Sequence, residues 1–173
     1  QMAFEAVDYK TERAARLGAL NTIRREADGS LTGDATDGAA MCAALEAAGG
    51  KIAGARARIL GAGGGAGQAI ADAFCSSGIA HVQLLDLDAD RQMQVMSNCR
   101  EHWPDVKMES AETPADILVN ATILGKNQSD PCPFTQDDIS AAHIVCDVVT
   151  GDNTPLIKTA IRDGKITVSG ADM

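Results

Sequence analysis

A glycine-rich segment at residues 60–67 (LGAGGGAG) has the composition and spacing of a phosphate-binding turn. It follows an apolar stretch and precedes an alanine-rich one, which is the strand–turn–helix context that this motif requires. Gly61 permits a tight turn, Gly63 lets the backbone approach a diphosphate, and Ala66 is small enough for the helix to pack on the strand. Backbone N–H groups and the positive end of the helix would hold the diphosphate. The residues expected to contact it are Gly61, Ala62, Gly63, Gly64, Gly65 and Ala66.

An acidic residue, Asp86, follows at the end of the next expected strand. In a dinucleotide site, a carboxylate at this place binds the adenosine ribose hydroxyls and repels a 2′-phosphate. The sequence therefore predicts dinucleotide binding, with NAD favoured over NADP. Two alternatives stay open at this point. One is an S-adenosylmethionine-dependent methyltransferase, which also pairs a Gly-rich turn with an acid at a strand end, and the other is a nucleotide fold without a ligand.

The apolar pattern around the turn predicts alternating strands and helices. We expect strands at residues 57–60, 81–86, 105–109, 116–121, 143–149 and 165–170, and helices at 64–77, 89–101, 135–141 and 155–163. Upstream, we expect helices at 4–17 and 36–48 and a pair of strands at 20–26 and 30–34. This alternation predicts an α/β fold with a doubly wound parallel sheet of the Rossmann type. Residues 110–115 are few for a parallel crossover, so either this crossover is tight or residues are absent there.

The composition narrows the class of protein and its partners. With 15 Lys and Arg against 24 Asp and Glu, the formal net charge is −9, which argues against binding to nucleic acid or anionic lipid. No apolar run approaches the roughly 20 residues of a membrane-spanning helix. The five cysteines form no C-x-x-C pair and the three histidines lack ligand spacing. We therefore expect free thiols, a cytoplasmic location and no metal site.

Further motifs occur in an order that resembles the shikimate/quinate dehydrogenase family. Residues 18–22 (GALNT) and 33–38 (GDATDG) resemble its paired GAxNT and GxNTDG motifs. Residues 120–125 (NATILG) resemble its NATxxG stretch, and residues 147–149 (DVV) with 154–156 (TPL) resemble its DxVYxPxxTPLL segment. The resemblance runs from about residue 11 to the end of the chain.

The resemblance implies an NAD(P)-dependent oxidoreductase acting on the ring hydroxyl of shikimate, quinate or a related cyclohexane carboxylate. The ketone forms would be 3-dehydroshikimate or 3-dehydroquinate. Asp37 would handle the proton together with a Lys, since oxidising an alcohol releases a proton that a positioned base must accept. Asn21 and Asp37 would bind the substrate hydroxyls. The cofactor contacts that the resemblance adds are Asn120, Ala121, Thr122, Gly125 and Val149.

The resemblance also implies a substrate domain in front of the dinucleotide domain. Residues 1–35 are then a remnant of the substrate domain, residues 36–49 a connecting helix, and residues 50–173 the NAD(P)-binding Rossmann domain. The family's catalytic Lys would lie at or just before Gln1, and its Gln after the final GxxM would lie past Met173. We therefore expect a chain truncated at both ends, and a protein that is a monomer or a homodimer.

Several positions depart from the family pattern. Ala35 replaces the Asn of NTDG, Lys126 stands where Met is frequent, and Thr150 replaces the Tyr of DxVY. Lys126 and Thr150 are expected at strand ends that face the nicotinamide. Asp86 itself is similar to the NAD-using branch rather than to the Asn-Arg-Thr of NADP-using members. The departures leave the substrate open and keep two alternatives: a non-catalytic nucleotide-binding regulator, and a methylene-tetrahydrofolate dehydrogenase-like enzyme on the same fold.

Overall fold

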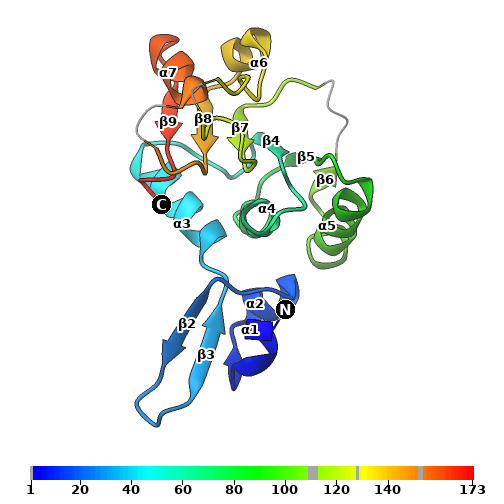
Figure 1. The fold of residues 1–173 in the computed structure, drawn as a ribbon. Helices are drawn as coiled ribbons and strands as arrows, with labels where there is room; N and C mark the ends of the chain where they lie inside the picture. Colours follow the sequence, from blue (N-terminus) through cyan, green and yellow to red (C-terminus); the bar gives the residue numbers. More distant parts are fainter. Residues whose placement is uncertain (1, 109–112, 128, 152–153) are drawn as a thin grey trace.

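The larger part of the protein is a six-stranded parallel sheet in the order β6-β5-β4-β7-β8-β9, with helices on both faces (Figure 1). The structure, a computed structural model, describes residues 2–108, 113–127, 129–151 and 154–173. The strands are β4 (Arg56–Leu60), β5 (His81–Leu85), β6 (Lys107–Met108), β7 (Ile117–Asn120), β8 (Ile144–Asp147) and β9 (Ile166–Val168). The helices are α4 (Gly65–Ser76), α5 (Ala89–His102), α6 (Gln136–Ala141) and α7 (Pro155–Arg162). The doubly wound parallel sheet that the sequence predicts is confirmed.

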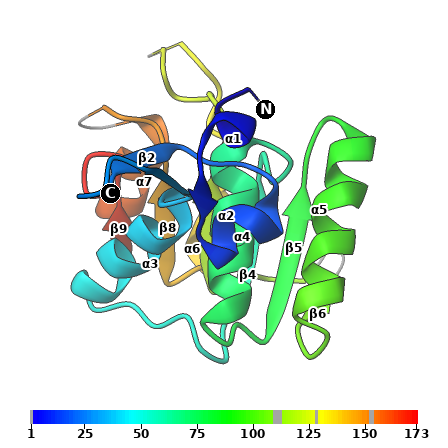
Figure 2. The same ribbon diagram turned by 90° about the horizontal axis from the view of Figure 1, so that it is seen from below.

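A second, smaller sheet lies at the other end of the molecule in the order β1-β3-β2 (Figure 1). Its strands are β1 (Tyr9–Lys10), β2 (Thr22–Arg25) and β3 (Leu31–Asp34), and the short helices α1 (Met2–Ala6) and α2 (Glu12–Leu17) accompany it. Strand β3 pairs antiparallel with β2 and parallel with β1. Helix α3 (Asp37–Ala47) leads from this sheet to the larger one and packs beside α4 (Figure 2).

The core consists of aliphatic side chains that alternate between the two faces of the large sheet. On β7, Ile117 and Val119 are fully buried in the cluster that includes side chains of α3, α4 and α5. Leu118, between them, is buried in a second cluster with side chains of α6 and α7. The strands thus form a middle layer between two helical layers (Figure 1). Burial on both faces explains why successive residues of β7 from Ile117 to Val119 are all apolar.

One expected element differs: residues 4–17 form two short helices and a strand instead of a single helix. Val7 is buried, and the carboxylate of Asp8 accepts a hydrogen bond from the backbone N–H of Leu31 at 2.8 Å. The following residues pair with β3, so tertiary pairing overrides the local helical pattern. A new helix, α2, then begins after Thr11, whose hydroxyl accepts a hydrogen bond from Ala14 N.

The short connection between β6 and β7 lies only partly within the described residues. In its described part, the carbonyl oxygen of Thr113 accepts hydrogen bonds from Arg58 Nη2 at 3.0 Å and Gln83 Nε2 at 2.6 Å. Arg58 also forms an ion pair with Asp138 of α6. Both Arg58 and Gln83 are buried in the sheet, so polar side chains fill this part of the second face. Such buried groups require partners, which the carbonyl and the carboxylate supply.

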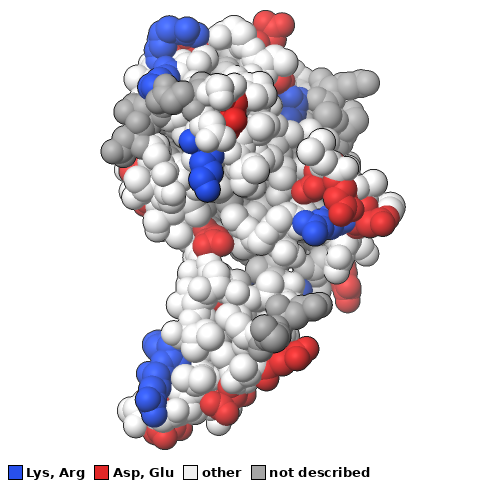
Figure 3. Space-filling model, in the orientation of Figure 1, with Lys and Arg blue, Asp and Glu red and all other residues white. Residues whose placement is uncertain are grey.

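The part of the molecule with the small sheet joins the part with the large sheet through a narrower region (Figure 3). Arg16 of α2 makes two hydrogen bonds of 2.7 Å to the carboxylate of Asp72 in α4, and its guanidinium lies 5.2 Å from the Trp103 ring centre. Trp103 Nε1 donates to the same carboxylate at 2.9 Å. These contacts fix α2 against the large sheet's helices. None of the helices that the structure describes is long and apolar enough to cross a membrane.

Candidate functional site

The loops that follow β4 and β7 meet where the strand order reverses. A Cβ placed on Gly61, just after β4, would lie 2.8 Å from the carbonyl oxygen of Ala121, just after β7. In open α/β sheets, ligands bind at the carboxyl ends of the strands at such a reversal. The predicted residues Gly61, Ala121 and Thr122 are therefore brought together at one edge of the sheet.

The glycine turn is held by hydrogen bonds to the end of β5 and to Asp86. Leu85 O accepts hydrogen bonds from Gly61 N at 2.8 Å and Ala62 N at 3.1 Å. Gly63 N donates to the Asp86 carboxylate at 2.8 Å. A Cβ on Gly63 would lie 2.5 Å from Arg91 Cβ, so only glycine fits between the turn and α5.

The N-terminus of α4 opens directly from this turn. Its N-cap residue is Gly64, which provides no side-chain hydrogen bond to the first N–H groups of the helix. Those N–H groups carry the positive end of the helix dipole and are suited to an anion such as a diphosphate. The residues present thus fit the phosphates of a dinucleotide.

The close packing of helix on strand that the sequence predicts at Ala66 occurs instead at its neighbour Gly67. A Cβ on buried Gly67 would lie 2.1 Å from Gly61 O and 2.8 Å from Ala62 Cα. Ala66 is only half-buried and lines a pocket instead. The reason is the helical phase: α4 turns Gly67 toward the strand-to-helix turn, while Ala66 points away from it.

Asp86 stands directly after β5 and remains ionised at neutral pH. Its Oδ1 accepts from Asp88 N at 3.0 Å, and these backbone N–H groups, with Arg91, hold the pKa of its carboxyl below the usual range. Asp86, Arg91 and Thr122 line a mostly apolar pocket of about 560 Å³. The strongly exposed side chains of Leu87 and Ile123 line it as well. An acid beside apolar walls suits a ribose next to a flat base.

Asn21, directly before β2, lies beside Asp37 in the first turn of α3. The amide Nδ2 of Asn21 donates a hydrogen bond to Asp37 Oδ1, and Asn21 Oδ1 accepts from Thr36 N at 2.9 Å. Both residues line a small cavity of about 60 Å³ with Gln68. Asp37 also lines a larger pocket of about 360 Å³, together with Ala66, Val148 and Thr150. Residues far apart in the sequence thus surround the Asp37 carboxylate.

The remaining predicted residues lie at the end of β7 and in the loops after β7 and β8. Asn120 is fully buried, and its amide Nδ2 donates to Leu124 O and to Asp147 Oδ1, both at 2.9 Å. Its side chain faces the protein interior and holds the loop after β7, but does not itself line the Asp86 pocket. Gly125 N donates to Asp130 at 3.1 Å, and Val149 N donates to Asp147 at 3.1 Å. Lys126 and Thr150 are exposed within these loops.

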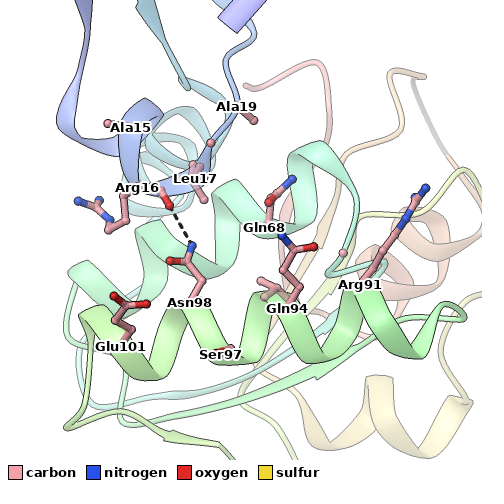
Figure 4. A pocket seen from close by; sticks show the side chains of 13 residues that line it. Ala15, Arg16, Leu17, Ala19, Gln68, Arg91, Gln94, Ser97, Asn98 and Glu101 are labelled. Atoms are coloured by element: carbon pink, nitrogen blue, oxygen red, sulfur yellow. Dashed lines mark hydrogen bonds between the residues drawn. The ribbon is translucent and has the colours of Figure 1, made fainter. Parts of the chain in front are cut away.

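A further groove of about 540 Å³ runs between α2 and the helices α4 and α5 (Figure 4). Gln68 of α4 and Gln94 of α5 line it, and Asn98 Nδ2 donates across it to Arg16 O at 3.2 Å. Arg91 lines both this groove and the pocket that contains Asp86. Neither Arg91 nor Gln68 was singled out by sequence motifs, because their placement depends on how α5 and α4 pack.

The fold and the turn define the class of protein. A six-stranded parallel sheet, a glycine turn that opens an uncapped helix and an acid after the next strand together make a dinucleotide-binding Rossmann domain. Among the described residues, no group of three or more His, Cys, Asp or Glu could hold a metal ion.

Comparison with known proteins gives the family. The chain is 49% identical over 171 residues to a shikimate dehydrogenase (NADP(+)) of Aeromonas salmonicida, covering 95% of this chain and 60% of that protein. It is 36% identical over 172 residues to the corresponding enzyme of Rubrobacter xylanophilus, with the same coverages of 95% and 60%. No protein-family model matches the chain. The chain is therefore homologous, over nearly its whole length, to the shikimate/quinate dehydrogenases, and the predicted family resemblance is confirmed.

Solved structures agree with this relationship. The quinate dehydrogenase of Corynebacterium glutamicum in complex with NAD superposes with a TM-score of 0.81 at 30% identity, covering 99% of this chain and 64% of that one. The 5-ketofructose reductase of Gluconobacter sp. strain CHM43 superposes with a TM-score of 0.86 at 28% identity, with coverages of 99% and 64%. The chain spans about 60% of the length of the two curated relatives. Those relatives are named for NADP, so the comparisons do not support the NAD preference that Asp86 predicts.

Proposed function

We propose that the complete protein is a nicotinamide-dependent oxidoreductase that interconverts a ring hydroxyl and a ketone on shikimate, quinate or a related cyclohexane carboxylate. One observation carries the proposal: the pocket of about 360 Å³ that joins Asp37 to Ala66 of the glycine segment and to Val148 and Thr150 after β8. In this pocket the Asp37 carboxylate, at the start of α3, lies near residues that follow the carboxyl end of β8. The carboxyl ends of the strands are where a nicotinamide would lie.

The residues of the large sheet would bind the dinucleotide along the strand ends. The adenosine half fits the pocket with Asp86, and the diphosphate fits the turn at Gly63 and Gly64. Ala121 and Thr122 line the same pocket as Asp86, whereas Gly125 and Val149 would lie toward the nicotinamide half. When bound, the nicotinamide supplies or accepts the hydride.

Asn21, before β2, and Asp37, at the start of α3, would hold the substrate and handle its proton. Asn21 is hydrogen-bonded to Asp37, so the amide fixes the carboxylate's orientation toward the substrate hydroxyl. Asp37 accepts a hydrogen bond from that hydroxyl and supports a base that takes its proton. Following the family resemblance, this base is a Lys outside these 173 residues. Residues 1–35 accordingly serve as part of a substrate-binding domain, and residues 50–173 as the dinucleotide domain.

Activity measurements on the complete protein test the proposal. We expect reduction of NAD or NADP in the presence of shikimate or quinate, followed by absorbance at the wavelength of the reduced nicotinamide. Oxidation of NADH with 5-ketofructose serves as a comparison, since a structural neighbour is named for that substrate. Dinucleotide binding without turnover of any of these compounds would favour a non-catalytic regulator and contradict the proposal.

The Asp86 carboxylate is proposed to favour NAD over NADP, and its replacement tests this. In Asp86→Asn the charge that would face a 2′-phosphate is removed, while Arg91 in the same pocket stays available to attract it. Two charges a few ångströms apart near a protein surface interact by about 1–4 kcal/mol. We therefore expect the ratio of kcat/KM for NADP to that for NAD to rise by about tenfold or more.

Asp90→Asn is the matched control, because Asp90 is an exposed acid in the first turn of α5. Steady-state kinetics with both cofactors should show an unchanged ratio for this variant. An unchanged or lowered ratio in Asp86→Asn would contradict a role of Asp86 in the choice of cofactor.

A further inference from the structure

A buried carboxylate, Asp147, stands at the end of β8 beside the last residue of β7. Asp147 and Asn120 are register partners on neighbouring strands, and both side chains are fully buried. Asp147 Oδ1 accepts hydrogen bonds from Asn120 Nδ2 at 2.9 Å and from Val149 N at 3.1 Å. Its Oδ2 accepts from Thr154 Oγ1 at 2.6 Å. One carboxylate therefore contacts β7, the loop after β8 and the start of α7.

Through Asn120, the carboxylate reaches the loop that lines the Asp86 pocket. Asn120 Oδ1 accepts from Thr122 N at 3.1 Å and Thr122 Oγ1 at 2.6 Å, and its Nδ2 also donates to Leu124 O. Residues 121–124 form one wall of the pocket that contains Asp86. The position of this wall thus depends on the orientation of the Asn120 amide, which Asp147 fixes.

Through Val149 and Thr154, the same carboxylate reaches the pocket that contains Asp37. Val149 lies between Val148 and Thr150, which both line that pocket. Thr154 caps α7 by accepting from Ile157 N at 3.2 Å, and its Cβ would lie 3.3 Å from a Cβ placed on Gly125. Val149, just after β8, and Thr154, just before α7, are therefore both held by hydrogen bonds to one side chain.

Because the Asp147 carboxylate is buried, it needs these hydrogen bonds in place of contacts with water. Burial raises the pKa of the Asp147 carboxyl, and the donors Thr154, Val149 and Asn120 oppose that shift. The three donors are neutral groups, and an acceptor without them would stay desolvated and unpaired. Removing the acceptor likewise leaves the donors without a buried partner, so both loops lose their anchor at once.

Building on the proposed function, we propose that Asp147 is a positioning residue that sets the spacing between the Asp86 pocket and the Asp37 pocket. A dinucleotide is two ligands joined by a diphosphate, so its affinity depends on both pockets being held at one separation. Asp147 itself does not contact the cofactor. It holds Asn120 and the loop after β8 so that a molecule spanning both pockets meets a preformed site.

The experiment compares a ligand that spans both pockets with one that fits only the Asp86 pocket. Isothermal titration of the complete protein with NADH and with ADP is carried out for the wild type and for Asp147→Asn. We expect the variant to lose about tenfold more affinity for NADH than for ADP, which is about 1.4 kcal/mol. Equal losses for the two ligands, or no loss for either, would overturn the proposal. A wild-type protein that binds neither ligand would overturn the proposed function as well.

If Asp147→Asn does not fold, variants of Thr154 test the same proposal. Thr154→Val removes the hydroxyl that donates to Asp147, whereas Thr154→Ser retains it. We expect the selective loss of NADH affinity in the first and wild-type affinities in the second. Thr135→Val is the matched control, because Thr135 caps α6 in the same way, accepting from Asp138 N at 3.1 Å, and lines neither pocket. A selective loss in Thr135→Val would show that helix capping alone causes the effect and would overturn the proposal.

Discussion

Replacement of Asp37 by Asn is expected to lower kcat of the complete protein by about 10²–10⁴-fold, the range that a positioned acid–base group contributes. The amide is nearly the same size as the carboxylate and keeps an oxygen that can accept from Asn21 Nδ2. It carries no negative charge to support a proton-accepting base, so the chemical step slows. Because Asn is nearly isosteric with Asp, both pockets keep their shape, and dinucleotide affinity should stay close to that of the wild type. Steady-state kinetics and titration with NADH measure the two quantities separately.

Asp137→Asn provides the control for this change. Asp137 is also an acid in the first turn of a helix, α6, and is exposed. Any effect that arises from losing a negative charge at a helix N-terminus should therefore appear in both variants. If Asp37→Asn retained wild-type kcat, or lost dinucleotide affinity to the same degree as activity, Asp37 would not have the proposed role.

The large sheet could be predicted from the sequence because its signals are local. The central strands are short and largely aliphatic, as in β7 (Ile117–Asn120), since burial on both faces favours apolar side chains. Helix ends are equally local: Thr154 caps α7 and Pro155 occupies its first turn. These signals depend on neighbouring residues alone, so one sequence is sufficient to read them.

The N-terminal segment could not be predicted in the same way. Its apolar and charged residues have a helical pattern, yet Tyr9–Lys10 pairs with residues of β3 more than twenty positions away. The free energy of that pairing depends on where β3 lies, which no local pattern reports. The same holds for Arg58, whose position within an aliphatic strand gives no sign of the carboxylate on α6 that it meets.

In the candidate site, too, some residues could be predicted from local sequence and others could not. The turn at Gly61–Gly63 and the acid Asp86 are recognisable from spacing, and the structure joins them by a hydrogen bond. Asp147 appears in the sequence only as part of a motif, because its partners come from two other segments. Side chains that contact a ligand can be predicted because the chemistry of binding requires particular residue types. Side chains that hold the loops can be identified only once the arrangement of the strands is known.

Gly67→Ala is expected to destabilise the protein by about 1–3 kcal/mol, the usual cost of inserting a methyl group where there is no space. The added Cβ would meet the backbone of the glycine turn, at 2.1 Å from Gly61 O and 2.8 Å from Ala62 Cα. Backbone atoms cannot rotate away as a side chain can, so α4 must shift from the turn. That shift also moves the N–H groups that fit a diphosphate, and NADH affinity should fall together with stability. The melting temperature should drop by roughly 2–12 °C for a protein of this size.

Gly65→Ala separates this packing effect from the effect of alanine on the helix itself. Gly65 is the first residue of the same helix, and a Cβ there has no atom of the surrounding structure within 4 Å. Alanine has a higher helix propensity than glycine, so this variant should be stabilised by up to about 1 kcal/mol or unchanged. Thermal unfolding of both variants gives the comparison. Equal melting temperatures for the two variants would contradict the close contact between Gly67 and the glycine turn. Only such a contact would make Gly67, but not Gly65, intolerant of a methyl group.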